Sequence, residues 1–138
     1  MFKLNFATPD KKVVSDADLE FIIVPAFAGA LDILPGHAPL MTTLEAGILA
    51  YKLKDGEAQK FAISWGYCQV SPEGVNVLAE SAMASGDIDL KVVNDHLKVE
   101  ENRLAVESLD DTQWTHTQNE IARLKAEIEL VGQGKNTH

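Results

Sequence analysis

Hydrophobic residues recur at every second position through much of the first half of the chain, which is the spacing of half-buried β-strands. The pattern starts at Phe2, Leu4 and Phe6 and returns in residues 19–24, 48–53, 61–65, 67–70 and 75–79. All five prolines and seven of the nine glycines lie in residues 1–86. Short strands separated by frequent turns predict a β-sandwich or barrel for this half.

Two turns stand out because their residues match known hairpin connections. Lys54-Asp55-Gly56-Glu57 separates two alternating runs, and Asp-Gly tolerates the positive φ angles of tight hairpin turns. Ser71-Pro72-Glu73-Gly74 separates the next two runs and has the composition of a β-turn. Both segments are predicted to join antiparallel neighbours.

The second half has the 3.6-residue period of helices, and no Gly or Pro occurs between Asp87 and Val131. Asp87 is expected to cap the first helix or favour its start, Asp110-Asp111-Thr112 to cap the second, and Gly132 to end it. The tail, residues 133–138, is expected to fray. The predicted apolar seam consists of Leu90, Val93, Leu97, Leu104, Trp114, Ile121, Leu124, Ile128 and Val131.

The short break between the helices predicts an antiparallel helical hairpin. Two helices of roughly 20 residues each cannot enclose a large hydrophobic core. The hairpin is therefore expected to be only marginally stable unless it packs on a third surface. We therefore expect it either to pack on the sandwich or to transfer to another protein.

Composition and charge narrow the class of protein. The chain has 138 residues, 46% of them hydrophobic and 24% charged, which is typical of a globular protein. The net charge of -9 would repel a phosphate backbone and argues against nucleic-acid binding. The single cysteine, Cys68, excludes an intramolecular disulfide, fits a reducing compartment and is expected to be a buried, inert thiol.

A membrane span and a secretion signal are not predicted. The longest apolar run, residues 21–31, contains Pro25 and Gly29 and is shorter than the roughly 20 residues that a spanning helix needs. The N-terminal residues lack the apolar core and cleavage site of a signal peptide. These features favour a cytoplasmic protein that reaches a membrane only through a partner.

Catalytic and metal-binding patterns are scarce. The histidines at 37, 96, 116 and 138 are scattered without metal-ligand spacing, and residues 132–137 lack the strand and helix that flank a phosphate loop. Residues 87–138 carry 11 acids and 6 bases, which suits either a solvated face or an interaction face. A binding or adaptor module is favoured over an enzyme, and the partner of the helix pair stays open at this point.

Four segments together resemble a known family. They are Ile33-Leu34-Pro35-Gly36-His37-Ala38-Pro39-Leu40, Gly47-Ile48, Ser64-Trp65-Gly66-Tyr67-Cys68-Gln69-Val70 and Val75-Asn76-Val77-Leu78-Ala79-Glu80-Ser81-Ala82. In order and spacing they resemble the epsilon subunit of bacterial and chloroplast F-type ATP synthases, called delta in mitochondria. The resemblance implies a ten-stranded β-sandwich over residues 1–86 and an antiparallel two-helix hairpin over residues 87–138, with a regulatory role for the hairpin.

The family also implies a function. Its members are non-catalytic rotor subunits of the central stalk, and they couple proton transport through the c-ring to ATP synthesis in the alpha/beta head. They bind the gamma subunit and the c-ring, and their helices, when extended, reach the head and inhibit ATP hydrolysis. The implied location is the cytoplasmic face of a bacterial inner membrane, with membrane contact only through the complex. An unrelated β-sandwich adaptor is the alternative, and an enzyme is the third.

The implied contact sites lie in the first half of the chain. Gly29, Ala30, Leu31 and Asp32 align with the family loop that touches the c-ring, although the family has an acid at the position of Ala30 and a glycine at that of Asp32. His37 aligns with a histidine near the gamma subunit. Trp65 replaces a family glycine.

The implied regulatory sites lie in the second half. Some members bind ATP through Ile/Leu-Asp-x-x-Arg-Ala, of which this chain keeps Ile88 and Asp89 but has Val92 in place of arginine. Valine cannot make the bidentate phosphate contacts of arginine, so we expect weak or no ATP binding and no cofactor or metal. Inhibition in the family uses bases on the second helix. That helix here carries Arg123 and Lys125 against Glu120, Glu127 and Glu129, so we expect weaker charge-driven inhibition.

Overall fold

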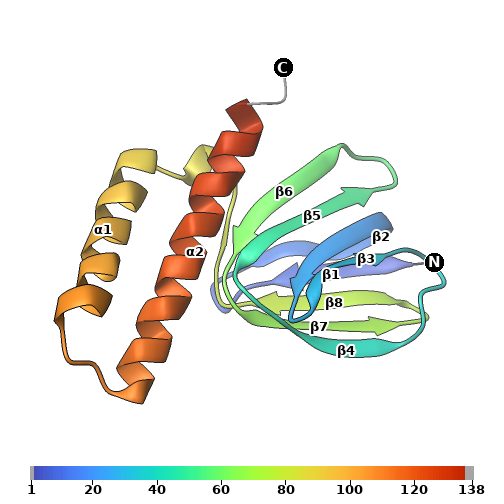
Figure 1. Ribbon diagram of the computed structural model, residues 1–138. Coiled ribbons are helices and arrows are strands. Elements are labelled where there is room, and N and C mark those ends of the chain that lie inside the picture. The colour runs from blue at the N-terminus through green and yellow to red at the C-terminus, as the bar shows by residue number, and fades with distance from the viewer. Residues whose placement is uncertain (1, 136–138) are drawn as a thin grey trace.

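The computed structural model describes residues 2–135, and the side chains through residue 132. A β-sandwich is followed by two helices (Figure 1), as the sequence predicts. The strands are β1 (Lys3–Ala7), β2 (Lys12–Ala26), β3 (Gly29–Ile33), β4 (Leu40–Leu44), β5 (Gly47–Leu53), β6 (Ala58–Ile63), β7 (Gly66–Ser71), β8 (Gly74–Ala79) and β9 (Ala82–Met83). The helices are the 3₁₀ turn η1 (Ser85–Asp87), α1 (Leu90–Val106) and α2 (Asp111–Lys135).

The sandwich has nine strands within the described residues, against the ten that the family resemblance implies. Their order is β1-β8-β7-β4-β2-β5-β6-β9, with β3 paired to β2. The 15-residue β2 pairs with β1 through its first half and with β5 and β3 through its second half. This one long strand therefore takes part in both layers of the sandwich, and it counts as one strand where two shorter strands would otherwise be expected.

The alternating residues of the first half form the core between the layers. Leu4, Phe6, Ile22 and Leu49 are fully buried, and the Phe6 ring meets the Phe61 ring edge-on at 5.6 Å. Both predicted hairpins are present, because β5 pairs with β6 and β7 with β8 in antiparallel register. Close packing of aromatic and branched side chains between the two layers forms the main hydrophobic core of the molecule.

The helix starts are set by aspartate caps. Asp110 accepts from the Gln113 N–H at 2.7 Å, while Gln113 Oε1 accepts from the Asp110 N–H at 3.2 Å, which is a reciprocal capping box. The prediction of Asp87 as the first cap is wrong. Asp87 ends η1, and Asp89 caps α1 by accepting from the N–H groups of Lys91 and Val92. The 3₁₀ turn shifts the start of α1 by two residues.

The end of the second helix also differs from the prediction. Gly132 lies inside α2, which continues to Lys135, so it is not the C-cap. Glycine lowers helix stability but does not prevent helical φ and ψ angles. The backbone of residues 133–135 belongs to α2, contrary to the predicted fraying, and the rest of that prediction, residues 136–138, lies outside the described residues.

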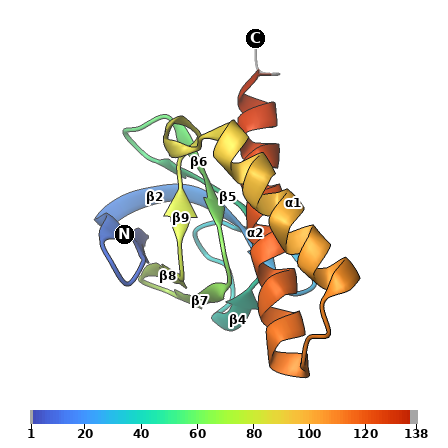
Figure 2. The same ribbon diagram turned by 90° about the vertical axis from the view of Figure 1, so that its left-hand side faces the viewer.

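The hairpin packs against the sandwich, and α2 is the helix in contact. In Figure 1 α2 lies between the sheet and α1, and in Figure 2 α1 crosses the outer side of α2. Ala126 and Leu130 of α2 pack on Ala62 of β6, and Ile48 and Ile88 border this cluster. Of the two states expected from sequence, the structure has the one in which the hairpin uses the sandwich as its third surface.

Candidate functional site

The predicted c-ring segment forms the turn between β2 and β3. Phe27 and Ala28 make a two-residue turn, and Gly29 follows with φ of +117°, a conformation that favours glycine. Phe27 is 75% exposed. Sequence reasoning missed this aromatic side chain, whose signal was its position between Pro25 and Gly29, two residues that favour turns. The turn therefore presents an apolar side chain to a partner.

The four predicted c-ring residues do not share one face. Ala30 and Asp32 are exposed, while Leu31 packs against the sandwich core. This alternation follows from the pleat, because β3 pairs with β2 in register and successive side chains point to opposite faces. Phe27, Ala28, Ala30 and Asp32 are thus the exposed side chains at this turn and on β3.

His37 lies in the turn that follows β3. Its N–H donates to the Leu34 carbonyl at 3.0 Å, and its ring Nδ1 donates to the Ala38 carbonyl at 2.8 Å. The five residues of β3 separate this turn from Gly29 by roughly 13 Å. His37 and the β2–β3 turn therefore form two surfaces at opposite ends of β3.

The two candidate nucleotide-binding residues have structural roles. Ile88 packs against the cluster of Ala62, Ala126 and Leu130. The Asp89 carboxylate accepts the two hydrogen bonds that start α1. Val92, where the family motif has arginine, is 61% exposed.

The predicted hairpin seam is only partly apolar. Val93, Ile121 and Leu124 are buried between or beneath the helices. The remaining aliphatic members are half-buried: Leu90, Leu97, Leu104, Ile128 and Val131. Trp114 is 44% exposed, contrary to the prediction that it belongs to the seam. It has the right spacing, but it lies in the first turn of α2, where α1 ends and leaves it uncovered.

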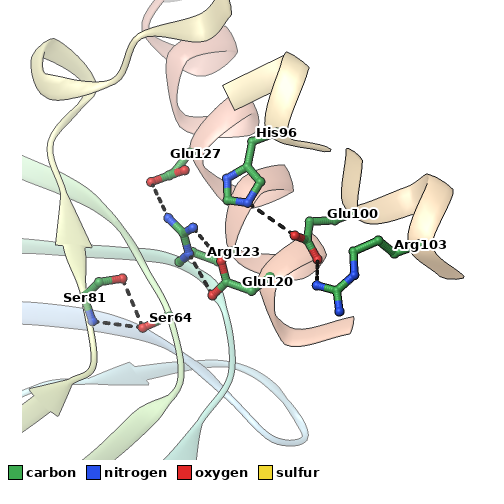
Figure 3. Close-up of polar contacts among 8 residues, drawn as sticks. All are labelled: Ser64, Ser81, His96, Glu100, Arg103, Glu120, Arg123 and Glu127. Atoms are coloured by element: carbon green, nitrogen blue, oxygen red, sulfur yellow. Dashed lines mark hydrogen bonds and ion pairs between the residues drawn. The ribbon is translucent and has the colours of Figure 1, made fainter. Parts of the chain in front are cut away.

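Polar residues fill much of the interface between the helices (Figure 3). Glu127 and Glu100 are 3% and 7% exposed, respectively. Arg123 Nη2 lies 2.8 Å from Glu120 Oε2, and Arg123 Nη1 lies 3.2 Å from Glu127 Oε1. His96 Nε2 lies 3.4 Å from Glu100 Oε1. We call His96, Glu100, Glu120, Arg123 and Glu127 the interhelical cluster.

The pKa values within this cluster move in opposite directions. Hydrogen bonds from Arg123 lower the pKa of the Glu120 carboxyl. Burial raises the pKa of the Glu127 carboxyl, and the nearby Arg123 offsets only part of that rise. The difference follows from the geometry, because Arg123 directs two of its nitrogen atoms to Glu120 and one to Glu127.

A cavity of about 290 Å³ separates α2 from one end of the sandwich. It is lined by Leu44, Glu45, Ala46 and Trp65 on the sandwich and by Gln118, Asn119 and Ala122 on α2. The Glu45 N–H donates to the Pro25 carbonyl at 2.9 Å, which holds this end beside the β2–β3 turn. The exposed turn and the first half of α2 therefore border the same end of the sandwich.

The remaining reactive side chains offer little chemistry. Cys68 is fully buried, and burial raises the pKa of its thiol to about 11, as expected for an inert cysteine. Across residues 2–135, His, Cys, Asp and Glu side chains do not gather in groups of three that could hold a metal ion. Within the same residues, no helix has the length and apolar character needed to cross a membrane.

Comparison of the sequence with known proteins matches the first half to one family. Residues 1–85 match the family model described as the β-sandwich domain of the ATP synthase delta/epsilon chain. The ATP synthase epsilon chain of Bdellovibrio bacteriovorus is 46% identical over 132 residues, which cover 95% of this chain and 94% of the relative. That of Koribacter versatilis is 42% identical over 103 residues, covering 75% of this chain and 71% of the relative.

Comparison of the folds agrees. A chain in the cryo-EM structure of the Euglena gracilis mitochondrial ATP synthase superposes with a TM-score of 0.78 at 19% identity, covering 93% of this chain and 79% of that one. A chain of the Tetrahymena thermophila mitochondrial ATP synthase, from its central stalk and c-ring structure, gives a TM-score of 0.65 at 14% identity over 94% and 96% of the two chains. Since the sequence likeness runs through the helices as well as the sandwich, the chain belongs to the ATP synthase delta/epsilon chain family.

Proposed function

We propose that this chain is the epsilon-type subunit of the central stalk of an F-type ATP synthase. In this role it binds the gamma subunit and the c-ring and couples proton transport through the ring to ATP synthesis in the alpha/beta head. The observation that carries the proposal is the 46% identity to an epsilon chain over 132 residues, sandwich and hairpin included.

The proposed subunit is not itself a catalyst. Its only thiol is buried, with the thiol pKa raised to about 11, and Arg123 is held by two carboxylates of its own helix. Arg123 and its two glutamate partners in the hairpin thus form ion pairs with one another. We further propose that it lies on the cytoplasmic face of a bacterial inner membrane and meets the membrane only through the complex.

Two surfaces suit the proposed partners. The β2–β3 turn offers Phe27, Ala30 and Asp32 to the c-ring, and the turn around His37 offers a second surface to the gamma subunit. An exposed aromatic side chain beside a small residue can insert between helices of a partner.

We also propose that the hairpin can leave the sandwich and slow ATP hydrolysis by docking on the head. The hairpin contributes a thin contact to the sandwich, centred on Ala62, Ala126 and Leu130. Few buried apolar contacts are typical of elements that detach on their own.

The test adds the full-length chain, or a fragment ending at Gly86, to the matching catalytic head depleted of this subunit. Co-elution of each with the head and gamma subunit is verified in the same samples, and circular dichroism verifies the fold of the fragment. We expect both to bind and only the full-length chain to slow hydrolysis. If both bind and the rates match, the inhibitory role is wrong while the stalk role stands. If neither binds, the stalk role is wrong.

A further inference from the structure

The interface between α1 and α2 buries more acid than it can neutralise. Glu100 faces it from α1, and Glu120 and Glu127 face it from α2 (Figure 3). Arg123 is the cation bonded within the cluster, and His96 carries positive charge only when protonated. A buried carboxylate without a full set of partners is costly in its charged form.

The contacts show which carboxylates lack partners. Arg123 makes its shortest bond, 2.8 Å, to Glu120. Glu127, which is more deeply buried, has a single bond of 3.2 Å to Arg123. Glu100 Oε2 is buried without a hydrogen bond, and the nearest Arg103 nitrogen is 3.6 Å away. Glu127 and Glu100 therefore each lack a full set of hydrogen-bond partners, and Glu127 would gain from a proton.

We propose that the interhelical cluster is a proton-sensitive latch, centred on the buried Glu127, that tightens the packing of α1 on α2 and the sandwich in mildly acidic solution and loosens it as pH rises. The proton binds at Glu127 and removes a buried negative charge. This favours the closed hairpin.

Charged groups around the cluster do not reverse this effect. The fields acting on Glu127 come from Arg123, Glu120 and His96, that is, from α2 and α1. Arg103 also pairs with Glu107 at 3.5 Å, and His116 acts on Glu120. The elements packed against α2 carry further charges: Lys52 on β5, which pairs with Glu20, Lys60 on β6, which has a partner of its own, and Asp87 on η1.

The direction follows from the two shifted carboxyls. Burial raises the pKa of Glu127, so its contribution to the closed hairpin is complete below its ordinary value of 4.5 and is lost as pH rises through the pKa of the folded state. Arg123 lowers the pKa of Glu120, so that contribution is lost only as pH falls below 4.5. Above 4.5, therefore, rising pH weakens the closed hairpin.

The latch can be tested on the full-length chain alone, independently of any ATP synthase. Amide hydrogen exchange of the α1 and α2 peptides is measured from about pH 4.5 to about pH 7.5, and the rates are corrected for intrinsic exchange. One linked proton changes an opening equilibrium by at most about tenfold per pH unit, and we expect at least about a twofold rise in hairpin opening across this range. Peptides of β7 and β8 serve as the internal reference.

Variants separate the latch from a general effect of pH. Glu127→Gln keeps the side-chain size and removes the titration, so its hairpin should stay protected at the alkaline end. Hairpin opening in this variant should be nearly independent of pH. Asp95→Asn, which removes an exposed charge from α1, should behave as the parent chain. Hairpin opening that does not change with pH in the parent chain, or an unaltered pH dependence in Glu127→Gln, would overturn the proposal.

Discussion

Thr117 shows how single residues weaken the hairpin. It is fully buried in α2, and its Oγ1 has no hydrogen-bond partner. It occupies the seam position one turn before Ile121, where an aliphatic side chain would continue the apolar pattern. A buried hydroxyl without a partner costs about 1–3 kcal/mol.

Thr117→Val should therefore stabilise the hairpin by about 1 kcal/mol, because valine has nearly the same shape and no unpaired hydroxyl. The measurement is the amide hydrogen exchange of α2 peptides, which should slow. Thr115→Val, at an exposed position of the same helix, is the control and should change little. Faster exchange in Thr117→Val would show that the hydroxyl has a partner in solution.

ATP binding is a second matter decided at individual residues. Asp89 is engaged in capping α1, and Val92 cannot replace the phosphate contacts of an arginine. We expect isothermal calorimetry of the full-length chain to show no saturable binding at micromolar ATP. A saturable isotherm would mean that other residues of the hairpin supply the phosphate contacts.

At the scale of elements, the contact between α2 and β6 decides where the hairpin lies. Ala126 is 4% exposed and Ala62 is 2% exposed, and these small side chains let the helix approach the strand closely. Nearby, Ala122 borders the cavity of about 290 Å³ instead. The same helix face therefore has one tightly packed position and one with free volume.

Ala126→Leu should loosen the hairpin while leaving the sandwich folded, because overpacking a filled interface costs about 1–3 kcal/mol. Hydrogen exchange should speed up in α2 and stay unchanged in β7 and β8. Ala122→Leu adds the same volume beside the cavity and is the matched control. Equal effects of the two substitutions would contradict the view that the contact at Ala126 is the tighter one.

At the scale of the whole molecule, the charge of the hairpin bears on inhibition. The full chain carries a net charge of -9, and on α2 Arg123 is bonded to Glu120 and Glu127. Docking of α2 on the alpha/beta head through basic side chains would then gain little from charge.

We expect any inhibition of the catalytic head by this chain to change little when salt is raised, because salt screens interactions between exposed charges and this docking would depend little on them. The measurement is the hydrolysis rate of the reconstituted head at low and high salt, with binding verified by co-elution. A steep loss of inhibition at high salt would show that exposed bases such as Lys125 make the docking contacts.

Local pattern was enough to predict most of the elements. Alternation at Phe2, Leu4 and Phe6 marks β1, and the Asp55-Gly56 turn marks the β5–β6 hairpin, because these preferences act between neighbouring residues. Asp110 was identified as a cap from its sequence neighbours alone. Asp87 is not the cap, because it is the last residue of the 3₁₀ turn η1. That turn depends on how the chain leaves the sandwich, which local pattern does not reveal.

The order of residues is enough to predict a β-sandwich followed by two helices, a buried cysteine and the family. The packed structure was needed to establish that α2, through Ala126 and Leu130, packs on β6, and that Trp114 remains exposed at the hairpin turn. It also decided that Glu127 is buried with a single partner. Periodicity reveals which side of a helix is apolar, but burial of a polar side chain depends on which surfaces meet, and that is a property of the packed molecule.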